Sequence, residues 1–162
     1  MKKLFFLLIF CSGLVIQTLA QDKHFDFELG VSQDSLKGIT VKKNMLMVIG
    51  RAKIVDGFQF LYNNIEFSCG LDSSRHVVYY STIDNKFLIN GFPYLTTNRH
   101  LIDSVVKAEG VKYSMQFGAY IDLENDWKLG FSATDLKYKK EKVVLKKKAI
   151  PMRLFKIDKE YI

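Results

Sequence analysis

Residues 58–67 read FQFLYNNIEF, and this stretch decides the fold of the chain. Phe58, Phe60 and Tyr62 alternate with other side chains before an asparagine pair, and Ile65 and Phe67 alternate after it. Period-two alternation is typical of a strand with one buried face, and asparagine tolerates the left-handed backbone of a tight turn. The stretch therefore predicts a β-hairpin and makes antiparallel sheet the starting point for the whole chain.

The same signals predict further strands along the chain. β-Branched and aromatic residues fill 77–83, and Asp84-Asn85 then turns into 87–89. A second hairpin is expected from 119–121 to 127–131, around Asn125-Asp126. Two more strands are expected near the end of the chain, at 143–145 and, after Pro151, at 155–157.

Helical spacing is scarce in this sequence. Leu101, Ile102, Val105 and Val106 share one helical face, which predicts a helix over about 99–109. Asn98 or Thr97 would cap its start and Gly110 would end it. A weaker helical turn is expected from Ser32 to Gly38. The predicted fold class is α+β, an antiparallel sheet with one or two short helices packed on it.

A faint internal duplication accompanies this order of elements. Asp34-Ser35 lies in the first helical turn and Phe67-Ser68 ends the first hairpin, while Asp103-Ser104 lies in the second helix and Phe131-Ser132 ends the second hairpin. The pattern predicts two helix-plus-hairpin half-repeats.

The stretch Leu29 to Ser132 resembles the β-lactamase-inhibitor-protein-like fold at the level of architecture, with helix entries at Leu29-Gly30-Val31-Ser32 and at Leu101 to Gly110. That fold also occurs in small envelope lipoproteins, whose lipidated cysteine directly follows the signal. This chain departs from that pattern with Gln21. The resemblance implies a fold and no binding residues, because function does not follow from fold.

The first twenty residues predict export. Lys2 and Lys3 precede an almost wholly apolar run over 4–16, and small residues at Thr18 and Ala20 predict cleavage before Gln21. The alternatives are a transmembrane anchor, for which the run is short, and a lipoprotein signal at Cys11. We expect residues 1–20 to be a signal peptide, 21–162 to be a single α+β domain, and the protein to be periplasmic or secreted. After cleavage only Cys69 remains, which excludes an intramolecular disulfide.

Positive charge is concentrated at the C-terminal end of the 162-residue chain, whose formal net charge is +7. Residues 137–162, the predicted basic strands, hold ten Lys or Arg against Glu141, Asp158 and Glu160. Val143 and Leu145 are expected to point inward, with lysines forming a positive strip on a sheet edge. Such a strip protects an edge from aggregation or binds an anionic membrane surface or polymer. The strip comprises Lys142, Lys146, Lys147 and Lys148.

Aromatic residues are the densest feature of the sequence, with 13 Phe, 8 Tyr and one Trp. Most should be core, but those with polar tips could share one sheet face. We expect a non-enzymatic binding protein whose partner is a protein or an envelope component, with no nucleic acid, because no nucleic-acid-binding module is present. The expected binding face comprises Tyr62, Tyr79, Tyr80, Tyr113, Tyr120 and Trp127.

The alternatives are a structural envelope protein and a small secreted hydrolase. The hydrolase would use Cys69 as nucleophile and His76 as base, with Asp72 or Asp84 orienting the imidazole. A buried structural cysteine is the stronger expectation. The three histidines show no metal-ligand spacing and no glycine loop suits a phosphate, so the sequence assigns no catalytic, cofactor-binding or metal residue.

Overall fold

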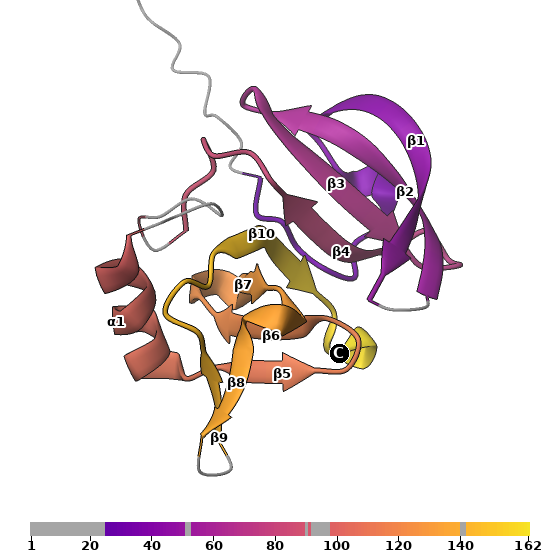
Figure 1. Ribbon diagram of the computed structural model, residues 1–162. Coiled ribbons are helices and arrows are strands. Elements are labelled where there is room, and N and C mark those ends of the chain that lie inside the picture. Colours follow the sequence, from indigo (N-terminus) through magenta and orange to yellow (C-terminus); the bar gives the residue numbers. More distant parts are fainter. Residues whose placement is uncertain (1–24, 51–52, 90, 92–97, 140–141) are drawn as a thin grey trace, which may run out of the picture.

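The computed structural model describes residues 25–50, 53–89, 91, 98–139 and 142–162 (Figure 1). Eight strands form one antiparallel sheet in the order β1-β2-β3-β4-β10-β7-β6-β5, and β8 and β9 form a separate two-stranded sheet. The fold is therefore sheet-dominated α+β, with one α-helix, α1, among the described residues. The strands are β1 (Thr40–Ile49), β2 (Lys53–Tyr62), β3 (Ile65–Leu71), β4 (Val77–Thr82), β5 (Lys112–Ser114), β6 (Gly118–Asp122), β7 (Lys128–Phe131), β8 (Leu136–Lys139), β9 (Lys142–Leu145) and β10 (Pro151–Ile157).

Both predicted asparagine hairpins are confirmed. β2 and β3 pair from Tyr62↔Ile65 onward, and Asn63 and Asn64 have φ of 50° and 60°. Between β6 and β7, Asn125 and Asp126 have φ of 54° and 62°. Asn63-Asn64 is a two-residue turn whose two positive φ values match the twist of the flanking strands and so set their register. Asn125 and Asp126 lie instead in a three-residue loop, which is closed by a hydrogen bond from the Leu123 amide to the Trp127 carbonyl oxygen.

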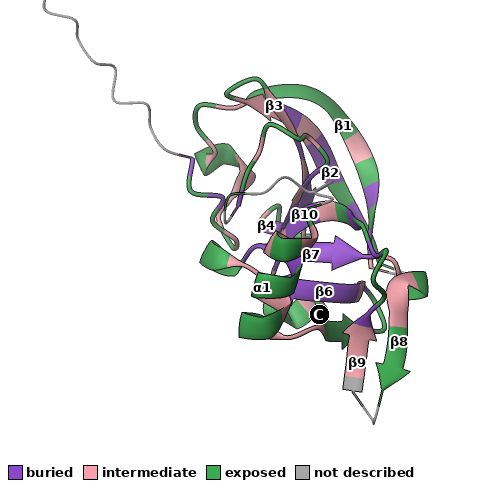
Figure 2. Ribbon diagram, turned by 60° about the vertical axis from the view of Figure 1, so that its left-hand side comes forward, coloured by how far each residue is buried: buried purple, intermediate pink, exposed green. Residues whose placement is uncertain are grey.

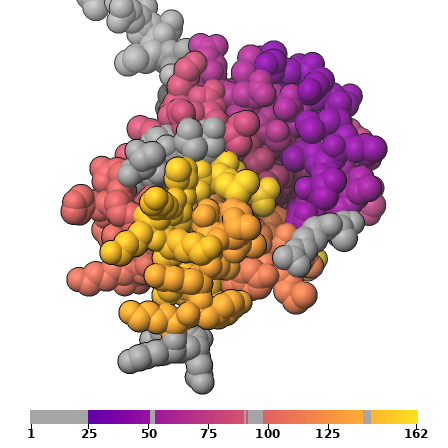
Figure 3. Space-filling model, in the orientation of Figure 1, coloured from indigo at the N-terminus to yellow at the C-terminus, as the bar shows by residue number. Residues whose placement is uncertain are grey.

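The last long strand, β10, lies in the middle of the sheet. It pairs with β4 through Leu154↔Thr82 and with β7 through Leu154↔Leu129, so it joins the earlier strands to the later ones. Pro151 is its first residue, where a missing N–H costs little. Figure 3 shows the N-terminal strands and the later strands gathered on different sides of the molecule.

The sheet is strongly curved, and its concave face holds a small second core. Figure 1 shows β1–β3 at a marked angle to β5–β7. Gly57 and Gly70 lie opposite each other on β2 and β3, and their missing side chains leave room for Met47 and Ile49. The Lys53 ammonium lies 3.8 Å from the centroid of the Tyr161 ring, so the C-terminal turn η4 (Lys159–Tyr161) closes this side. The buried residues of this core are Met47, Ile49, Val55, Val78, Tyr79, Phe117, Tyr120, Phe155 and Ile157.

The larger core lies on the other face of the sheet. Helix α1 (Arg99–Glu109) packs there against β6 and buries Ile102, while its outer side faces solvent (Figure 2). The Asn98 side chain accepts a hydrogen bond from the Leu101 amide, and Gly110 ends the helix at φ 76°. The predicted helix and both of these boundary residues are confirmed, whereas Thr97 lies outside the described residues.

Several elements differ from the sequence-based prediction. β1, β5 and β8 were not expected, although Met45, Met47 and Ile49 alternate along β1. The stretch 87–89 is not a strand, because Phe87 turns into the larger core instead of pairing along the sheet. The weak helical turn after Ser32 is the single 3₁₀ turn η1 (Gln33–Ser35). β5 and η1, with three residues each, carry too few periods for a pattern to identify them, whereas β1 does alternate and the prediction did not use that signal.

None of the helices among the described residues has the length and apolar composition needed to cross a membrane.

Candidate functional site

A cleft of about 600 Å³ opens between five separate segments of the chain, on the side of the larger core. Its volume lies within the range of small-ligand pockets in proteins, about 300–1,000 Å³. We call it the aromatic cleft. It is lined by Phe25, Asp26, Phe27, Glu28, Tyr62, Asn63, Ile65, Phe87, Leu88, Ile89, Asn125, Asp126, Trp127 and Lys156.

Interlocked aromatic rings form the floor of this cleft. The Phe27 ring lies 4.6 Å from Phe25, 5.6 Å from Phe87 and 5.3 Å from Trp127, measured between centroids. Phe87 also lies 4.9 Å from Trp127, and Phe25 lies 5.3 Å from Tyr62. Edge-to-face and tilted ring pairs each contribute about 0.5–1.5 kcal/mol beyond their buried area. These contacts hold the rings of the floor against one another.

The segment Phe25–Glu28 is held in place by two hydrogen bonds. The Phe25 amide donates to the Tyr62 hydroxyl oxygen at 3.0 Å, and the Tyr80 hydroxyl donates to the Glu28 carbonyl oxygen at 3.3 Å. Phe27 has φ of 50°, a backbone conformation that bulky residues rarely adopt. Ring packing and the two hydrogen bonds together hold it there.

Carboxylates dominate the rim of the aromatic cleft. Asp26, Glu28 and Asp126 are exposed. Lys156 is half-buried and is the only lysine or arginine among the lining residues. The site is thus locally acidic on a chain that is basic as a whole. Carboxylates beside aromatic faces favour a cationic group over an anionic one.

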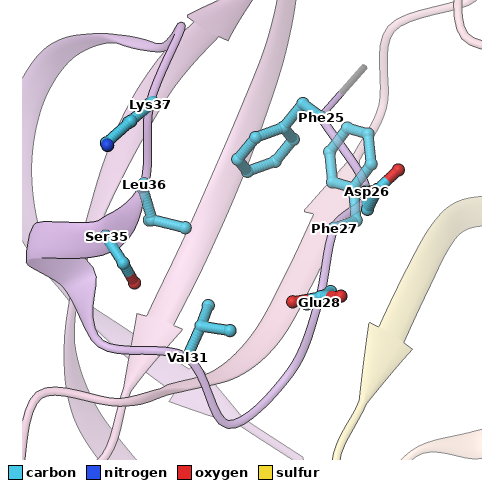
Figure 4. A pocket seen from close by; sticks show the side chains of 8 residues that line it. All are labelled: Phe25, Asp26, Phe27, Glu28, Val31, Ser35, Leu36 and Lys37. Atoms are coloured by element: carbon cyan, nitrogen blue, oxygen red, sulfur yellow. The ribbon is translucent and has the colours of Figure 1, made fainter. Parts of the chain in front are cut away.

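A smaller hollow of about 230 Å³ adjoins the cleft across the segment Phe25–Glu28. Figure 4 shows the Phe25 ring extending toward Leu36 and the Asp26 carboxylate pointing the other way. Alternation along this segment therefore buries its two phenylalanines and leaves its two carboxylates in solvent.

The structure does not gather the six predicted aromatic residues on one face. Tyr79 and Tyr80 are neighbours on β4, so their side chains point to opposite faces of the sheet. Tyr120 is buried with Tyr79 in the small second core, and Tyr113 is 39% exposed on β5. Of the six, only Tyr62 and Trp127 line the aromatic cleft.

Sequence reasoning missed the phenylalanines of the cleft. Phe25 and Phe27 alternate with Asp26 and Glu28, a short pattern that could have indicated an extended segment with one buried side. No local pattern places Phe87 beside Trp127, because the contact joins residues 40 positions apart through the sheet order.

The predicted lysine strip is only partly where the sequence placed it. Lys146, Lys147 and Lys148 are exposed, but they follow the two-stranded sheet, whereas the edges of the large sheet are β1 and β5. The described lysines of the strip therefore lie beside the two-stranded sheet and on neither edge of the large one. The side chain of Lys142 lies outside the described residues. Leu145 is buried as expected, and Val143 is half-buried.

Cys69 is fully buried at the centre of β3, opposite Tyr80. Burial raises the pKa of its thiol far above the ordinary value. A thiol without solvent access and without ready ionisation is not a nucleophile, which contradicts the use of Cys69 in the hydrolase alternative. His76 lies beyond the end of the β3–β4 ladder, where its Nδ1 is 3.8 Å from the Asp72 Oδ2.

A charge cluster joins the last three strands of the large sheet. Asp122 pairs with Lys112 and lies 3.1 Å from the Lys128 ammonium, which is largely buried. Burial alone would raise the pKa of Asp122, but these two ammonium groups outweigh it and hold the pKa below its usual range. The carboxylate therefore stabilises the fold when it is ionised.

Asp122→Asn should lower the free energy of unfolding by about 1–3 kcal/mol at pH 7, because it leaves Lys128 without its charge partner. A lowered folded-state pKa means that this stabilisation is present above the unfolded pKa of about 3.9 and is lost as pH falls through the folded value. Urea unfolding of both proteins at several pH values measures the difference, which should shrink toward acid. Glu66→Gln breaks the exposed Lys42 pair instead and should cost under about 1 kcal/mol. Equal costs for the two variants would contradict the role of Asp122.

In the part of the chain that the structure describes, no group of three or more His, Cys, Asp or Glu is placed to hold a metal ion. Comparison with protein-family models, with curated proteins and with solved structures found no match.

Proposed function

We propose that this chain is an exported, non-enzymatic binding protein and that the aromatic cleft is its binding site. The observation that carries the proposal is a cleft of about 600 Å³ with a floor of packed rings and a rim of carboxylates. Apolar walls with a few placed polar groups are the usual composition of a ligand site. Export rests on the N-terminal sequence, which lies outside the described residues.

The chemistry of the cleft favours a ligand that joins an apolar or aromatic body to a positive charge. Phe87 is half-buried over the buried rings of Phe25 and Trp127, while Glu28 and Asp126 supply negative charge at the rim. A segment of another protein with an aromatic side chain next to a lysine or arginine has this chemistry. We therefore propose a protein partner, in agreement with the sequence-based expectation.

Trp127 makes the proposal directly testable. It is the only tryptophan of the chain, it is buried, and it lines the cleft, so its fluorescence reports on occupancy. We expect phenylethylamine, a small aromatic cation, to change the emission with saturation in the millimolar range, as suits a fragment of this size. Phenylpropionate, an anion of similar size, should give a weaker response.

A double variant distinguishes recognition of the ligand's charge from non-specific binding. Glu28→Gln with Asp126→Asn should remove the preference for the cation, whereas Asp34→Asn with Glu160→Gln makes the same change of charge at exposed positions outside the cleft. The control should keep the preference. If neither probe perturbs Trp127, or if the control variant behaves like the cleft variant, the proposed site is wrong.

We infer further that the chain is built from two related halves of the kind found in β-lactamase-inhibitor-protein-like folds. Supporting this, the hairpins β2–β3 and β6–β7 both turn on an asparagine at positive φ and lie on either side of β4 and β10 in the sheet order. The helical parts are unequal, because η1 has three residues and α1 has eleven.

A further inference from the structure

The hairpin β8–β9 extends away from the body of the molecule, as Figures 1 and 2 show. Its base is anchored by Leu136 and Leu145, which face each other and pack against the larger core. Two residues farther out, Tyr138 faces Val143 on the same side of the hairpin. Tyr138 is 73% exposed, so the apolar side of the hairpin continues beyond the core into solvent.

The other side of the hairpin is basic. Lys137 and Lys139 alternate with Tyr138 and are exposed. Among the described residues, no carboxylate forms an ion pair with Lys137, Lys139, Lys147 or Lys148. These exposed lysines give the described part of the hairpin and the loop after it a positive field.

We propose that the hairpin docks on the surface of an anionic lipid bilayer along the edge of β8 that faces away from β9, where Lys137 and Lys139 on one side of the strand and Tyr138 on the other can all reach the surface. Charge complementarity selects an anionic surface, and each lysine near such a surface contributes to binding. A soluble polyanion would use the lysines alone, whereas the interfacial layer of a bilayer also takes up an amphipathic tyrosine ring. The exposed tyrosine between two exposed lysines therefore favours lipid over an acidic polymer or protein.

Vesicle co-sedimentation of the exported protein tests this docking, with phosphatidylcholine vesicles containing or lacking one third phosphatidylglycerol. We expect binding only to the anionic vesicles, and weaker binding at high salt. Lys137→Gln with Lys139→Gln should weaken it about 25-fold, at about fivefold per lysine. Tyr138→Ser should weaken vesicle binding about fivefold, because it removes the ring that is partly buried in the bilayer interface.

Matched variants elsewhere on the surface give the controls. Lys37→Gln with Lys43→Gln removes the same charge from exposed positions, and Tyr113→Ser removes another exposed tyrosine. Both should bind within about twofold of the unmodified protein. Docking through the hairpin is wrong if the unmodified protein does not bind anionic vesicles, or if the control lysines matter as much as Lys137 and Lys139. If the lysine pair matters and Tyr138→Ser does not, the hairpin binds by charge alone, and the proposal that Tyr138 selects lipid over a soluble polyanion is overturned.

Discussion

Leu154→Ala should lower the free energy of unfolding by about 2–4 kcal/mol and the Tm by roughly 5–15 °C. Leu154 is fully buried in β10, at the position that pairs with β4 on one side and β7 on the other. The substitution leaves a cavity in the larger core at the strand that joins both parts of the sheet. Thermal and urea unfolding followed by far-UV circular dichroism measure the loss.

Met152→Ala provides the control on the same strand. Met152 is 57% exposed and lies at the irregular pairing between Pro151 and Arg153. Its truncation should cost under about 0.5 kcal/mol, as is usual for surface positions. Equal losses for Leu154 and Met152 would show that β10 does not occupy the buried centre of the sheet.

Gly57→Ala should destabilise the fold by about 3 kcal/mol or more, because a methyl group packed against backbone atoms cannot be accommodated by moving a side chain. A methyl group on Gly57 would overlap the carbonyl oxygen of Cys69 on the paired strand and would lie 2.7 Å from the Met47 sulfur. The oxygen belongs to the β2–β3 ladder, so the ladder itself would have to shift. The backbone of Gly57 is not in the left-handed region, so the cost is steric.

Gly130→Ala separates this backbone overlap from ordinary crowding. A methyl group there would lie 3.1 Å from a ring carbon of Phe155, and a ring can move by a few tenths of an ångström. We expect a cost of about 1 kcal/mol in the same unfolding experiments. A Gly57→Ala protein as stable as Gly130→Ala would mean that the two strands do not approach as closely as described.

Elements with strong local signals could be predicted from the sequence. The two hairpins follow from alternation around Asn63-Asn64 and Asn125-Asp126, and α1 follows from its apolar spacing and its two boundary residues. These signals are local, because a turn or a cap is decided by a few neighbouring residues. β5, with three residues, offers less than two periods of alternation and could not be distinguished from loop.

The candidate site could not be predicted, because it depends on sheet order. Tyr62 and Trp127 were expected to contribute to binding, and they do line one cleft, but Tyr79, Tyr80 and Tyr120 are core residues. The other residues that line the cleft come from distant parts of the chain, and the sheet order, with β10 between β4 and β7, brings them together. A single sequence does not encode such long-range neighbours as a pattern.

The central position of β10 in the sheet also means that the complete sheet forms only after β10 has been released. A ribosome or a translocation channel releases a chain from its N-terminus, so β10 emerges after both groups of described strands that it joins. Until then the early hairpins have no partner on one side, and the sheet lacks its middle. Pairing across such a long stretch is intrinsically slow. For a protein that we propose is exported, the two groups of strands would therefore stay unjoined until β10 has crossed the membrane.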